Sequence, residues 1–165
     1  MTDTVTNEPL PSLDPAALLA GDLTPGKLDA FKAAVFHTVD SLEQLRDWLG
    51  NPKAKGTARG VALWALGRHE EAVPLLSADK TNATVALCLA SSLAALGQID
   101  EAGKLLTRRE TDPAQALVWL RALDAAGEGT RLIKDFARAQ ALLSPADRKY
   151  FAGREHEFNH DTHAA

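Results

Sequence analysis

Cysteine is almost missing from the sequence: Cys88 is the single one among 165 residues, so no disulfide can form within the chain. That is typical of a protein in a reducing compartment. Aromatic residues are also scarce, at 5% of the chain. Alanine and leucine dominate instead, and both favour helix over strand. The composition therefore predicts an all-α protein.

An excess of basic charge is lacking as well. The chain has 18 lysine and arginine residues against 22 aspartate and glutamate residues, a formal net charge of -4. A domain that binds nucleic acid usually carries a basic patch, and the pair Arg108–Arg109 is too short a run to make one. We therefore expect no nucleic-acid partner.

Long apolar runs do not occur either. A membrane-spanning helix needs about 18 or more apolar residues in succession, so no membrane span is expected. The N-terminal sequence MTDTVTNEPLPSLDP is polar and acidic, without the basic start and apolar core of a secretory signal. We therefore expect a cytoplasmic protein that does not contact membranes. Its 45% of hydrophobic residues is sufficient for one folded domain.

An internal repeat of thirty residues is present. Three segments align without gaps: VALWALGRHEEAVPLL from Val61, SSLAALGQIDEAGKLL from Ser91 and RALDAAGEGTRLIKDF from Arg121. They share a glycine column, formed by Gly67, Gly97 and Gly127. A weaker copy, FKAAVFHTVDSLEQLRDW, has His37 in that column. Agreement of several columns at one fixed spacing indicates a repeated structural unit.

Each unit is predicted to be a helix, a glycine turn and a second helix. Glycine directly after a helix supplies the left-handed backbone that helix C-termini often need. Asn, Asp or Ser near a proline is typical of a helix start. Such signals restart the units at Asn51–Pro52, Thr81–Asn82, Asp112–Pro113 and Ser144–Pro145. We expect helix pairs over 26–49, 55–78, 82–109 and 113–142, and a closing helix from Pro145.

These units resemble the tetratricopeptide repeat (TPR) family. The segments ALGRHEEAVPLL and LGQIDEAGKLL carry the resemblance, with a Leu-Gly turn followed five residues later by Ala72 or Ala102. The resemblance implies a short right-handed superhelix of three to four antiparallel helical hairpins with a C-terminal capping helix. The family period is about 34 residues, so this chain departs from it through shorter helices or tighter turns. A neighbouring helical-repeat family and a helical bundle without repeats are the alternatives.

The predicted organisation has three parts. Residues 1–12 are expected to form a flexible N-terminal arm, residues 13–157 the TPR-like helical repeat domain, and residues 158–165 a polar C-terminal tail. A closing helix is needed because the last unit of a repeat stack otherwise exposes its apolar face.

In this family the first helix of each hairpin lines a concave groove, and the matching positions here are mostly apolar or small. They lack the Lys, Asn and Arg set with which some family members hold a C-terminal carboxylate. The groove therefore suits an apolar or amphipathic helical segment of a partner protein. Trp64 suits an anchor or a packing role equally, whereas Trp48 and Trp119 suit packing. The groove positions are Lys27, Phe31, Thr57, Val61, Trp64, Leu87, Ser91, Ala94, Leu117, Arg121 and Asp124.

The C-terminal stretch contains the pattern H-E-x-x-H, from His156 through Glu157 to His160. On a helix this pattern can hold zinc together with a general base. A zinc hydrolase also needs a third protein ligand, for which His163 stands close to the chain end, and charged residues flank the motif. We favour a solvated polar tail and expect neither a metal nor another cofactor.

These features predict a non-catalytic scaffold or adaptor that binds a protein partner in its groove. One alternative is a zinc-dependent hydrolase that uses His156, Glu157 and His160. Another is a structural subunit whose groove is filled by a permanent partner, by a second copy in a homo-oligomer, or by its own N-terminal leucines. Those leucines are Leu10, Leu13, Leu18 and Leu19.

Overall fold

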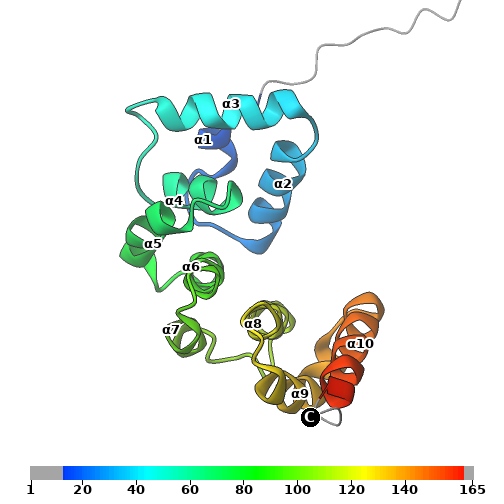
Figure 1. Ribbon diagram of the computed structural model, residues 1–165. Helices are drawn as coiled ribbons and strands as arrows, with labels where there is room; N and C mark the ends of the chain where they lie inside the picture. Colours follow the sequence, from blue (N-terminus) through cyan, green and yellow to red (C-terminus); the bar gives the residue numbers. More distant parts are fainter. Residues whose placement is uncertain (1–12, 162–165) are drawn as a thin grey trace, which may run out of the picture.

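The structure is a computed structural model that describes the backbone of residues 13–161 and the side chains of residues 13–159. This part of the chain is helical and contains no strand (Figure 1), which confirms the all-α prediction. The helices are α1 (Pro15–Leu18), α2 (Pro25–Val35), α3 (Val39–Gly50), α4 (Gly56–Ala65), α5 (His69–Leu76), α6 (Ala83–Ala95), α7 (Ile99–Leu105), α8 (Pro113–Ala125), α9 (Gly129–Ala139) and α10 (Pro145–Asp161), with 3-10 turns η1 (Ser77–Asp79) and η2 (Gln140–Leu142).

Consecutive helices pack against each other in pairs. α2 packs on α3, α4 on α5, α6 on α7 and α8 on α9, and α10 packs on α9. α6 also contacts α5 and α8, which joins neighbouring pairs. Figure 1 shows α6 and α8 next to each other, with α7 and α9 on one side and α2 and α10 at the two ends of the other side. The helix boundaries lie within a few residues of the predicted pairs.

The three glycine turns share one geometry. Gly67, Gly97 and Gly127 have φ of 73°, 77° and 70°. In each turn the glycine N–H donates to the carbonyl three residues back, at 3.0, 2.9 and 3.0 Å, and the next N–H donates to the carbonyl five residues back, at 2.9, 2.8 and 2.9 Å. These two bonds satisfy carbonyls that the helix end leaves free. The turn at His37 differs, because no residue there has positive φ and Thr38 caps α3 instead.

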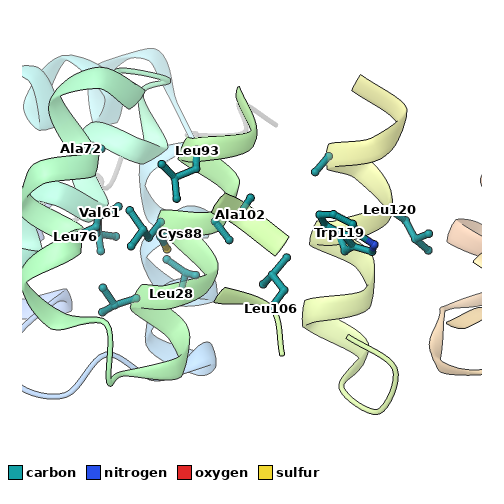
Figure 2. Packing of buried hydrophobic residues seen from close by; sticks show 14 of the residues in the cluster. Leu28, Val61, Ala72, Leu76, Cys88, Leu93, Ala102, Leu106, Trp119 and Leu120 are labelled. Atoms are coloured by element: carbon teal, nitrogen blue, oxygen red, sulfur yellow. The ribbon is translucent and has the colours of Figure 1, made fainter. Parts of the chain in front are cut away.

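Small residues allow close approach within the first two glycine-turn pairs. A Cβ added at Gly60 would lie 3.0 Å from Cγ of Leu76 on α5, so a larger residue would push α4 and α5 apart. Ala72 and Ala102 are fully buried, as their common column predicts. Figure 2 shows both alanines within the continuous buried cluster that also contains Cys88 and Leu106.

Most of the predicted helix starts are confirmed. The side chains of Asn82, Asp112 and Ser144 each accept a hydrogen bond from a backbone N–H of the helix that follows. The prediction at Asn51–Pro52 is wrong, because Asn51 instead ends α3. The next helix, α4, begins only at Gly56, whose φ of 59° turns the chain into it.

The C-terminal boundary also needs a correction. The polar tail expected from residue 158 is helical up to Asp161, and Phe158 packs against the buried cluster. A Cβ added at Gly129 would lie 2.6 Å from Cδ1 of Phe158, so the ring lies directly over the start of α9. The expected arm over 1–12, which contains Leu10, and the end of the tail, which contains His163, lie outside the described residues.

Candidate functional site

The predicted groove positions on α4, α6 and α8 fall on one face of each helix. Leu87, Ser91 and Ala94 are spaced by four and three residues, as are Leu117, Arg121 and Asp124, so each set follows one side of its helix. We call the surface formed by these six residues together with Trp64 the inner face. α6 and α8 pack against each other, which brings the two sets into adjacent rows.

Two predicted groove residues belong to the core instead. Phe31 is 0% exposed and Val61 is 1% exposed, so neither can contact a partner. Phe31 lies on the buried side of α2 together with Leu28 and Val35. Val61 is covered because the segment before α2 folds over α4. A small cleft of about 70 Å³ remains between this helix and Leu19 and Leu23 of the covering segment. Thr57 lines the same cleft.

The segment before α2 therefore occupies the first part of the predicted groove. Leu19 and Leu23 are buried, and Leu13 and Leu18 pack partly buried against the cluster. The Asn82 side chain donates a hydrogen bond of 3.0 Å to the Leu23 carbonyl, which ties this segment to the start of α6. The Lys27 side chain also binds this segment, because its Nζ donates hydrogen bonds to the carbonyls of Ala20 and Asp22. This end of the predicted groove is therefore not available to a partner segment.

Trp64 remains partly exposed next to that end. Its ring packs against the buried cluster on one side, and Nζ of Lys32 from α2 lies 5.1 Å from the ring centroid. A lysine above a tryptophan ring is a favourable cation–π arrangement. Sequence reasoning did not identify Lys32, because nothing in the repeat indicates which α2 side chain reaches α4.

The last part of the inner face pairs with α10, which buries most of Asp124 and leaves Arg121 exposed. Arg121 forms an ion pair with Asp147 at 3.2 Å. The Asp124 carboxylate accepts hydrogen bonds from the Tyr150 hydroxyl at 2.6 Å and from Nε of Arg154 at 2.7 Å. The bond to Asp124 raises the pKa of Tyr150, because it is donated by the protonated phenol. Both charged residues of the inner face thus have partners within the chain.

The middle of the inner face is uncharged and partly buried. Leu87, Ser91, Ala94 and Leu117 are each partly accessible, and the three apolar ones pack from below onto the buried cluster. Cys88 lies under this surface, 1% exposed. Burial raises the pKa of its thiol to about 12, so the group stays protonated and is a poor nucleophile at neutral pH.

Trp119 is a packing residue, as predicted. It is 3% exposed, and its Nε1 donates to Oδ2 of Asp135 at 2.7 Å. The guanidinium carbons of Arg109 and Arg131 lie 4.9 and 5.3 Å from its ring. Trp48 also packs, partly buried, against the cluster. Neither ring belongs to the inner face.

A second hollow of about 310 Å³ opens at the glycine turn between α4 and α5, lined in part by His69 and Glu70. Nδ1 of His69 lies 3.3 Å from Oγ of Ser92. Ser92 is 0% exposed, so no substrate could reach its hydroxyl. Arg68 and Glu71 in the same hollow pair with each other. We interpret the His69–Ser92 contact as packing between α5 and α6.

The H-E-x-x-H pattern lies on the last turns of α10. His156 and Glu157 are exposed, and the Glu157 carboxylate pairs with the Arg154 guanidinium. The side chain of His160 lies outside the described residues. Among the described residues, no three His, Cys, Asp or Glu side chains come together as metal ligands would.

Comparison of the chain with protein-family models, curated protein sequences and solved structures finds no match. Between residues 13 and 161, none of the helices has the length and apolar character needed to cross a membrane.

Proposed function

We propose that this chain is a non-catalytic interaction module of TPR-like helical hairpins, which binds a helical segment of a partner protein on its inner face. The shared geometry of the three glycine turns supports the repeat interpretation, since one backbone solution recurs at one spacing. A right-handed superhelix with α10 as its cap is the architecture that such repeats build.

The observation that carries this proposal is the uncharged, partly accessible middle of the inner face. Leu87, Ala94 and Leu117 contact the core on one side and solvent on the other. Apolar area of this kind gains about 25 cal/mol for each Å² that a partner removes from water.

The partner segment that fits best is an amphipathic helix. Its apolar side would cover the rows of α6 and α8, while its polar side would stay in water. Charged side chains lie only at the two ends of the surface, with Lys32 above Trp64 at one end and the Arg121–Asp147 pair at the other. A short helix with apolar residues at its centre therefore leaves no charge buried.

The segment that precedes α2 fills one end of the predicted groove, and α10 fills the other end. A fully self-filled groove would also bury Leu87 and Leu117, and both remain partly accessible. No described segment of the chain closes the middle of the groove, which leaves that part open to an external partner.

The test is capture from a lysate of the source cells, with bound proteins identified by mass spectrometry. Wild type is compared with Leu87→Glu and with Leu105→Glu, a matched control that places the same charge at another half-buried leucine, on α7. We expect one or more proteins to be retained by wild type and Leu105→Glu but lost from Leu87→Glu. Equal retention by all three would contradict the proposal.

A further inference from the structure

α10 occupies the place where a bound helix would continue along α8. Leu117, Arg121 and Asp124 follow one side of α8 in succession, and α10 holds the last two through Asp147, Tyr150 and Arg154. A partner helix that covers Leu117 and extends by one turn would meet α10. The closing helix and a longer partner therefore compete for the same surface.

Little apolar surface attaches α10 to the rest of the protein. Among residues 145–159 only Phe151 is buried, whereas α6 buries seven of its residues. Phe151 contacts the ring of Phe136 on α9, with 6.0 Å between the ring centroids. Phe158 adds a second contact over Gly129. These two rings, the Asp124 carboxylate and the Arg121–Asp147 ion pair are among the contacts that hold this helix of 17 residues.

On the basis of the proposed function, we propose that α10 is an autoinhibitory arm, a helix that can detach from the rest of the protein. In the free protein it buries most of Asp124 and pairs with Arg121, which limits the inner face to the rows from Trp64 to Leu117. Its release uncovers Asp124 at the last turn of α8, so that a longer amphipathic helix with a polar end can bind.

The first test measures α10 opening directly by amide hydrogen exchange of the full chain, read out by mass spectrometry. Gly129→Ala introduces a Cβ 2.6 Å from the Phe158 ring and should loosen α10 without changing the inner face. Gly153→Ala is the matched control, since a Cβ there has nothing within 4 Å and alanine favours the helix.

We expect amides of 148–159 to exchange faster in Gly129→Ala, because the Phe158 ring has to move away from the new Cβ. In Gly153→Ala they should exchange up to about fivefold slower, the factor that glycine-to-alanine helix propensity gives. Exchange in α4–α7 should not change. If amides of α10 exchange only as fast as those of α8, in wild type and in both variants, α10 opens only with the whole protein and the proposal is wrong.

The second test repeats the lysate capture with the same two variants. Gly129→Ala should retain more partner than wild type and Gly153→Ala less. If exchange in α10 changes but the captured amount does not, α10 opens without controlling the inner face, and the autoinhibitory role is excluded while the adaptor role stands. If Leu87→Glu retains as much partner as wild type and Gly129→Ala retains no more, both the adaptor function and the autoinhibitory role are wrong. The exchange data still show whether α10 opens.

Discussion

The helices from α4 to α7 meet through small side chains, whereas those from α8 to α10 meet through rings and charges. In the first region Gly60, Ala72 and Ala102 bring the helix backbones close together. In the second, Trp119 lies between two arginines, and Phe151 packs on Phe136. The glycine turns are nevertheless the same in both regions.

The two regions show that the glycine turn and the packing between helices depend on different residues. The turn is a backbone structure that depends on positive φ at one glycine. The packing depends on side-chain volume, and the third pair carries Leu120 and Leu132 in the columns where the earlier pairs carry glycine or alanine. Both leucines are buried, so α8 and α9 need more room between them. Aromatic and charged contacts join the helices at this end.

The largest effect we expect is a difference in stability loss between a core position and an inner-face position of the predicted groove. Val61→Glu places a charge at a position that is 1% exposed, and should lower the free energy of unfolding by about 4 kcal/mol. Leu87→Glu, at a position that is partly accessible to water, should cost less, about 1 kcal/mol. Urea unfolding followed by circular dichroism measures both. Equal losses would contradict the assignment of Val61 to the core.

The next effect tests how α10 is attached. Phe151→Ala removes the one buried side chain that the described part of α10 contributes, and should cost about 3 kcal/mol. Because the loss is confined to the end of the stack, hydrogen exchange should rise most in α9 and α10. A loss spread evenly over all helices would show that the two regions unfold as one unit.

A smaller effect probes the close packing of the first region. Ala102→Leu introduces three carbon atoms at a fully buried position of α7, and overpacking of this kind costs about 2 kcal/mol. Thermal unfolding measures the change. A neutral or stabilising outcome would show that α6 and α7 have spare room and would remove the contrast with the leucine-filled pair α8–α9.

The smallest effect is a pH dependence from Cys88. Burial raises the pKa of its thiol from 9.0 to about 12, so above pH 9 the unfolded chain releases a proton that the folded chain keeps. Stability therefore falls as the pH rises through this interval, by about 1 kcal/mol between pH 8 and pH 10. Cys88→Ala should remove that part of the slope. An identical slope in both proteins would mean that the thiol is accessible to water.

Much of the fold could be predicted from the sequence, because the features that fix it are local. The glycine column located the turns, and caps such as Asp112 located helix starts. Asn51–Pro52 misled the prediction because the same residues also end helices. The columns Ala72 and Ala102 located buried positions, since a repeat places equivalent residues in equivalent environments.

The candidate site could be predicted only in its middle. Val61 was wrongly placed in the groove because a repeat pattern does not show that the segment around Leu19 folds over α4. Arg121 and Asp124 lie on one side of α8, and their partners Asp147 and Tyr150 are 26 residues further along. No periodicity links residues across that distance, so the covering of this surface by α10 required the structure.

The most direct test of the central claim is photo-crosslinking from the inner face in the source cells. Benzoylphenylalanine is placed at Leu117, on α8, and in a matched control at Leu105, on α7. We predict that position 117 crosslinks to a discrete partner protein and that position 105 does not. Crosslinking to the same proteins from both positions, or to none from position 117, would contradict a binding role for the inner face.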